Sequence, residues 1–203
     1  MKALKIVLLI FLAINLSCKD EPVIDTSQEE TSISTFYLIR HAEKNRNNPD
    51  DSDPELNQKG LGRAMHWAEI LADTELNAIY STDYNRTAMT AAPTSVKQNI
   101  DVQYYDPSTI DIAQFKADNI NSNVLIVGHS NTTPEFVNKL IDEQKYYDID
   151  DSENGTLFIV MIINGISSVE KLIFNCNCQI KIISSAITFK RLRHSFKCSY
   201  FCL

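Results

Sequence analysis

The segment Thr35-Phe-Tyr-Leu-Ile39-Arg40-His41 sets the interpretation of this sequence. Its first five residues form a β-branched, aromatic and apolar run, which is typical of a short buried strand, and the run stops at a charged pair. A strand of this kind carries the residues that follow it to the carboxyl edge of a sheet. We therefore expect residues 35–39 to form a buried strand and Arg40 and His41 to lie in a functional site.

Strand and helix patterns alternate after this segment. Further strands are expected at residues 77–80, 102–105, 124–127 and 157–163. Helices are expected at residues 60–72, 86–98, 108–118 (with Ser108 as N-cap) and 132–141. In the first helix, Leu61, Met65, Ala68 and Ala72 share one stripe that we expect to be buried. The alternation predicts an α/β fold, with a three-layer arrangement of a mostly parallel sheet flanked by helices.

The charge of the chain is divided unevenly. The 203 residues have a formal net charge of −7, and all 26 Asp and Glu residues lie at or before Glu170. Residues 1–170 therefore carry −13, and residues 171–203 carry +6. The acidic part lacks the clustered Lys and Arg that a phosphate backbone requires, which argues against nucleic acid as a partner.

The N-terminus has the pattern of an export signal. Lys2 and Lys5 precede the apolar run 6–14, which is too short for a permanent transmembrane helix. Cys18 follows Leu16-Ser17, so residues 1–17 resemble a lipoprotein signal, although Asn15 departs from that pattern. A plain signal peptide is the alternative. We expect a lipid-modified Cys18, a polar tether over residues 18–34, and a location in the cell envelope, attached to a membrane through the lipid.

Polar side chains follow three of the expected strands. Arg40-His41 ends the first strand, the segment 81–87 containing Arg86 follows the second, and Gly128-His129-Ser130-Asn131 follows the strand at 124–127. Two guanidinium groups beside two imidazoles favour a phosphoryl ligand, because each guanidinium can bind phosphate oxygens bidentately. A neutral imidazole among these groups can attack phosphorus and carry a covalent intermediate.

Three motifs together resemble the histidine phosphatase superfamily, which includes the cofactor-dependent phosphoglycerate mutases. They are Arg40-His41-Ala-Glu43, Ser81-Thr-x-x-x-Arg86-Thr-x-x-Thr-Ala-x-Pro93 and Gly128-His129-Ser-Asn. The resemblance covers residues 35–163 and implies a mixed, mostly parallel sheet flanked by helices. It implies that His41 is the phosphorylated nucleophile and that Arg40, Arg86 and His129 bind the phosphoryl group.

The resemblance leaves several points open. The general acid is not assigned, and Glu43, Asp83, Asp106 and Glu135 are all candidates. A phosphohistidine or acyl phosphate substrate would not need such an acid. The expected function is hydrolysis of a phosphorylated small molecule or phosphoprotein, with specificity from the loops 45–58 and 101–118. The alternatives are a mutase-type phosphotransferase, for which the 43 positions between Arg86 and His129 leave little room, and a catalytically silent phosphate-binding module.

No metal or cofactor is expected. The segment Asp148-x-Asp150-x-Ser152 begins like a calcium loop but has Glu153 where glycine is required. The acidic stretch 50–53 is expected to be a solvated loop.

Residues 171–203 form a basic tail that contains Cys176, Cys178, Cys198 and Cys202. Zinc binding, disulfides and contact with anionic lipid are alternatives for this tail. We favour a segment out of register with the family, because the composition changes abruptly there. Deletion of residues 171–203 is therefore expected to leave a folded, active protein.

Overall fold

The computed structural model describes residues 31–174 in full and residues 180–183 as backbone alone. The predicted signal, Cys18 and the four cysteines of the tail lie outside the described residues. Within the described ranges, no helix is both long enough and apolar enough to cross a membrane.

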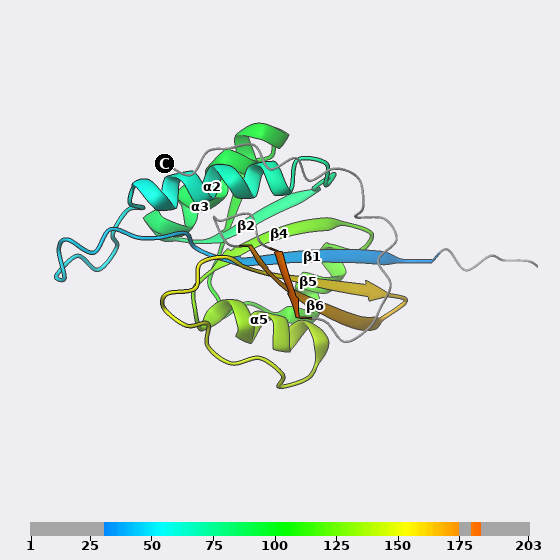
Figure 1. The fold of residues 1–203 in the computed structure, drawn as a ribbon. Coiled ribbons are helices and arrows are strands. Elements are labelled where there is room, and N and C mark those ends of the chain that lie inside the picture. The colour runs from blue at the N-terminus through cyan, green and yellow to red at the C-terminus, as the bar shows by residue number, and fades with distance from the viewer. Residues whose placement is uncertain (1–30, 175–179, 184–203) are drawn as a thin grey trace, which may run out of the picture. The chain divides into compact units, whose positions relative to one another are not determined.

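A seven-stranded sheet forms the centre of the fold (Figure 1), in the spatial order β3-β2-β4-β1-β5-β6-β7. The strands are β1 (Ile33–Arg40), β2 (Ala78–Thr82), β3 (Val102–Tyr105), β4 (Asn123–Gly128), β5 (Thr156–Ile163), β6 (Ile166–Phe174) and β7 (Ile180–Ile183). Strands β3, β2, β4 and β1 are parallel neighbours, whereas β5, β6 and β7 are added in antiparallel fashion. The α/β class is confirmed, and the sheet is mixed, with its parallel half on the side that carries the predicted motifs.

Helices cover both faces of the sheet. They are α2 (Gln58–Ile70), α3 (Asn85–Gln98), α4 (Ile112–Asp118) and α5 (Thr132–Ile141). In Figure 1, α2 and α3 lie on one side of the sheet and α5 lies on the other. Because side chains alternate along a strand, β1 contributes Phe36 and Leu38 to the core beneath α4 and α5, and Ile39 to the core beneath α2 and α3. The three-layer arrangement is therefore observed.

The buried face of α2 differs from the predicted stripe. Leu61 and Met65 are exposed, and the helix instead buries Gly60, Arg63, Ala64, Trp67 and Ala68. Trp67 has the largest apolar surface in the helix and packs edge-to-face on Phe174, with ring centroids 5.5 Å apart. Burial of this indole outweighs burial of Leu61 and Met65, so it sets the rotation of the helix.

The start of α4 also differs from the prediction. Ser108 lies in a turn closed by the Asp106 carboxylate, which accepts hydrogen bonds from the backbone N–H and the hydroxyl of Ser108. The helix begins four residues later, where the Asp111 side chain accepts from the N–H groups of Ala113 and Gln114. The N-cap prediction at Ser108 is wrong because Asp111 supplies the better-placed acceptor.

Both predicted ends of the domain need correction. β1 begins at Ile33, where it pairs with Ile163, so the last two residues of the predicted tether belong to the sheet. β6 was not predicted, and it continues past residue 170 to the buried residue Phe174. The predicted boundary at residue 170 therefore falls inside β6, and the dispensability of the tail stays a prediction.

Candidate active site

Sheet topology brings the predicted motifs to one edge. In the parallel ladder Arg40 pairs with Gly128, and Ser81 pairs with Val127, so β1, β4 and β2 end side by side. The side chains that follow these strands line one open pocket of about 840 Å³. Arg40, His41, Arg86 and His129 are all among its lining residues, as the sequence predicted.

His41 lines this pocket, and one of its two ring nitrogens is hydrogen-bonded to the backbone. Its Nδ1 donates a hydrogen bond to the carbonyl oxygen of Ala42 at 2.7 Å, so Nδ1 carries the proton and the Nε2 lone pair is available. The main chain of His41 is also fixed, because its N–H donates to Gly128 and its carbonyl accepts from Asn154. Burial, reinforced by the charges of Arg40 and Arg86, lowers the pKa of His41 to about 3. The ring is therefore a neutral imidazole at physiological pH, as a nucleophile must be.

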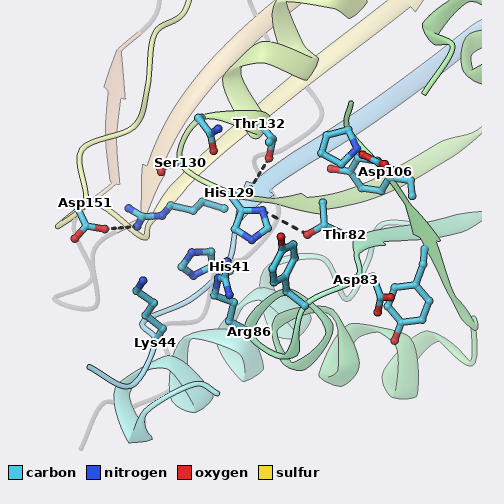
Figure 2. A pocket seen from close by; sticks show the side chains of 16 residues that line it. His41, Lys44, Thr82, Asp83, Arg86, Asp106, His129, Ser130, Thr132 and Asp151 are labelled. Atoms are coloured by element: carbon cyan, nitrogen blue, oxygen red, sulfur yellow. Dashed lines mark hydrogen bonds and ion pairs between the residues drawn. The ribbon is translucent and has the colours of Figure 1, made fainter. Parts of the chain in front are cut away.

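His129 faces His41 across the pocket. The two rings meet edge-to-face with centroids 5.4 Å apart, and the Nε2 atom of His129 is buried without a hydrogen-bond partner among the described residues. Burial, followed by the charges of Arg86 and Arg40, lowers the pKa of His129 to about 4. In Figure 2 a dashed line joins this ring to Thr82 at the end of β2.

Gly128 allows the turn between β4 and α5 to close tightly. A Cβ atom at this position would come within 3.0 Å of the Thr132 hydroxyl oxygen and 2.9 Å of that of Thr133. The Thr132 hydroxyl accepts a hydrogen bond from the N–H of His129 and so fixes the start of the motif. A larger residue at position 128 would therefore force the Thr132 and Thr133 hydroxyls to shift.

Arg40 is almost completely buried, and the loop before β5 holds it in place. One guanidinium nitrogen donates to the carbonyl oxygens of Asp150 and Glu153, and another forms an ion pair of 2.7 Å with Asp151. The Nε atom of Arg40 is buried and has no partner among the described residues. The loop thus orients the charge and leaves Nε as a donor for a ligand.

Arg86 enters the pocket from the first turn of α3. Its guanidinium carbon lies 4.4 Å from the centroid of the Tyr84 ring, and its Nη1 bonds to Asp53 at 3.1 Å. Thr90 ties this helix to the segment that follows His41, because its hydroxyl accepts from the N–H of Ala42 and donates to the Arg86 carbonyl. The position of Arg86 relative to His41 is therefore fixed through one side chain.

Asp53 and Asp151 were not anticipated as parts of the site. Asp53 lies in the stretch expected to be a solvated loop, yet it accepts from the N–H of Asn85 and pairs with Arg86. Asp151 lies in the acidic loop that was considered only as a calcium motif. Neither contact can be found from spacing, since each joins a loop to a residue at least 33 positions away. The one sequence feature that could have indicated these contacts is the acidic composition of the two loops, because acidic loops are expected to pair with the arginines of the site.

The four candidate general acids differ in their position relative to the pocket and in their partners. Glu43 is outside the pocket and pairs with Arg63 on α2; burial raises its pKa, but the bonds and charge of Arg63 outweigh this and lower the pKa overall. Glu135 is exposed and pairs with Lys139 on α5. Asp106 lines the pocket, but hydrogen bonds from Ser108 lower its pKa and keep it ionised. Asp83 lines the pocket and makes no ion pair within the described ranges.

Arg63 on α2 is buried, and it donates two hydrogen bonds to Glu43 and one to the carbonyl oxygen of Phe174. Within residues 31–174, no group of three or more His, Cys, Asp or Glu side chains is positioned to hold a metal ion.

The family model described as histidine phosphatase superfamily (branch 1) matches residues 36–107. No curated protein matches the sequence.

Three solved structures of the same fold illustrate the likeness. The protein histidine phosphatase SixA, solved with tungstate, has a TM-score of 0.57 at 15% identity and covers 71% of this chain and 99% of its own. YhfR of Bacillus stearothermophilus has a TM-score of 0.53 at 20% identity, over 66% of this chain and 94% of its own. Phosphoglycerate mutase of Bacillus anthracis str. Sterne has a TM-score of 0.51 at 17% identity, over 68% and 92%. At these identities the likeness shows the fold. The match to the family model covers residues 36–107, which include Arg40, His41 and Arg86 but not His129.

Proposed function

We propose that this protein is a phosphatase that hydrolyses a phosphomonoester or a phosphohistidine through a phosphorylated His41. The observation that carries the proposal is the neutral His41 ring, with Nδ1 bonded to Ala42 and Nε2 available, beside Arg40, Arg86 and His129. The tungstate complex of SixA, a protein histidine phosphatase with this fold, is consistent with an oxyanion ligand here.

The first step is attack of His41 Nε2 on the substrate phosphorus. The new P–N bond forms as the bond from phosphorus to the leaving group breaks, and the leaving group departs with the bonding electron pair. The guanidinium groups of Arg40 and Arg86 offset the negative charge on the equatorial oxygens, and the neutral His129 ring donates a hydrogen bond to them. In the second step water attacks the phosphorus of phospho-His41, the P–N bond breaks, and inorganic phosphate leaves.

The carboxylates around the pocket favour substrates with good leaving groups. Asp151 is paired with Arg40, and Asp106 is held ionised by Ser108. In the view of Figure 2, Asp83 and Asp106 lie on the opposite side of His129 from Lys44 and Asp151. Asp83 is exposed to solvent and is the remaining candidate for a general acid. The amine of a phosphoramidate and the phenolate of an aryl phosphate are good leaving groups that need little help from an acid. We therefore infer that P–N and aryl substrates react faster than alkyl phosphates.

Hydrolysis of phosphoramidate and 4-nitrophenyl phosphate tests this function. We expect turnover by the wild type, none by His41→Ala, and a loss of about 10²-fold or more in Arg86→Ala, as for removal of a transition-state charge partner. His66→Ala, on α2 and away from the pocket lining, is the matched control and should keep wild-type turnover. Binding of phosphate without turnover of either compound would instead favour the silent phosphate-binding module.

We also propose that the protein acts outside the cytoplasm, attached to a membrane through a lipid on Cys18. The charged and apolar pattern of residues 1–17 supports this proposal. Metabolic labelling with an alkyne fatty acid tests it, because the label should be lost in Cys18→Ser. Persistence of the label in this variant would contradict the assignment.

A further inference from the structure

Lys44 lies where two pockets meet. It lies three residues after His41 in the sequence and lines the 840 Å³ pocket together with His41. It also lines a second pocket of about 500 Å³, formed by the loop that connects β1 to α2. Figure 2 shows its side chain rising from the chain beside His41, with the ammonium end turned into the site. A group bound at Lys44 would therefore be in reach of both pockets.

Lys44 differs from the arginines at the site in its charge partners. Arg40 pairs with Asp151, Arg46 pairs with the second oxygen of Asp151, and Arg86 pairs with Asp53. In the part of the chain that the structure describes, no carboxylate lies within 4 Å of the Lys44 ammonium. A half-buried ammonium that faces a pocket without a counter-ion favours an anion from outside the protein.

The second pocket has a lining that suits such an anion. Its residues are polar amides, two cations and two leucines: Lys44, Asn45, Arg46, Asn47, Leu56, Asn57, Gln58 and Leu61. No Asp or Glu is among them, although the chain carries 26 acidic residues. An acidic group would therefore meet amide donors and positive charge there and no carboxylate.

The second pocket is built on ordered backbone. Lys44 and Leu56 form an antiparallel bridge, and the N–H of Asn45 donates to the carbonyl of Glu55 at 2.7 Å. Asn57 closes the loop, because its side chain donates to the Lys44 carbonyl and accepts from the N–H of Gly60. The Lys44 backbone is thus held on both sides.

We propose that Lys44 binds a second anionic group of the substrate, a carboxylate or a second phosphate, and that the second pocket receives the part of the substrate bearing it. This inference rests on the proposed function, since it takes the phosphoryl group to lie on Arg40, Arg86 and His129. Lysine suits this role because its ammonium is a point charge on a flexible side chain, so it can bind either anion without requiring a fixed geometry.

Binding to the non-hydrolysing variant His41→Ala tests the inference with two matched ligand pairs. O-phosphoserine differs from O-phosphoethanolamine by one carboxylate, and propane-1,3-diyl bisphosphate differs from propyl phosphate by one phosphate. Calorimetry should show about tenfold tighter binding of the doubly anionic ligand in at least one pair, the lower end expected for a charge-assisted bond. The pair that responds identifies the anion.

Variants of Lys44 assign the preference to this residue. Lys44→Ala in the same background should reduce the preference to less than twofold, and Lys44→Arg should retain most of it. Lys139→Ala, which removes an exposed lysine on α5, should leave it unchanged. Equal affinities within both pairs, no binding of either doubly anionic ligand, or a preference that survives Lys44→Ala would each overturn the inference. Failure of the wild type to hydrolyse any phosphate would contradict the proposed function while these affinities still decide the role of Lys44.

Discussion

At the scale of single residues, the site depends on imidazoles that stay neutral. His41 is buried and His129 is half-buried beside two guanidinium groups, and the pKa values of about 3 and about 4 follow from burial first and from those charges second. The sequence motifs predicted which residues meet, because strand ends fix their place. They could not predict the protonation state, which depends on burial and on the bond from Nδ1 to Ala42.

The pKa values predict two consequences of lowering the pH. NMR of the imidazole C–H groups should show no titration of His41 or His129 between pH 8 and pH 5. Unfolded histidine has a pKa of 6.5, so below this pH the unfolded chain binds protons that the folded chain excludes. The free energy of unfolding should therefore fall as the pH falls from about 6.5 toward 4.

Thermal unfolding at pH 7 and pH 5 measures the second consequence. The loss of Tm between these values should be smaller in His41→Ala than in the wild type, because one excluded proton site is gone. An identical loss in both proteins, or an ordinary titration of His41 near pH 6.5, would contradict the burial argument.

At the scale of elements, α2 supports the segment that carries His41 and Glu43. Arg63 reaches from this helix to the carboxylate of Glu43 and to the end of β6. Gly60 lies so close to Glu43 that a Cβ atom would meet the Glu43 carbonyl oxygen. The helix itself was predictable from its periodicity. Its rotation was not, because Trp67 and the buried Arg63–Glu43 pair outweigh the apolar stripe of Leu61 and Met65.

The two cations on Glu43 should differ greatly in their contribution to stability. Arg63→Ala leaves a mostly buried carboxylate without its main partner and should lower the free energy of unfolding by about 3–5 kcal/mol. Lys59→Ala removes an ammonium that is 64% exposed and bonds to the same carboxylate, and it should cost under about 1 kcal/mol. Urea unfolding of both variants measures the difference. Equal costs would mean that the buried pair has no special role.

At the scale of the whole molecule, the acidic part of the chain and the fold do not end at the same residue. The last acid is Glu170, but β6 continues to Phe174, whose N–H donates to the Gly155 carbonyl and whose ring packs on Trp67. The composition predicted a boundary near residue 170, because no acidic residue follows Glu170. It could not show that four more residues complete a strand that ends at the buried residue Phe174.

Truncation tests this boundary. A chain ending at Ile183 keeps β6 and β7 and should unfold in a single cooperative transition. A chain ending at Glu170 loses the Phe174 side chain, worth about 3–5 kcal/mol in a core, and should be soluble in much lower yield or unfold well below the longer chain. Phe174→Ala in the full chain is the matched control and should reproduce most of the loss. Equal stability of the two truncated chains would show that β6 can end at residue 170.

The central claim is that His41 carries the phosphoryl group during turnover. Its most direct test is rapid acid-free quenching of the wild type with a ³²P-labelled aryl phosphate, followed by peptide mapping. The account predicts an acid-labile label on the peptide containing His41, chased to inorganic phosphate on further incubation and absent in His41→Ala. A label on any other residue, or turnover that persists in His41→Ala, would contradict it.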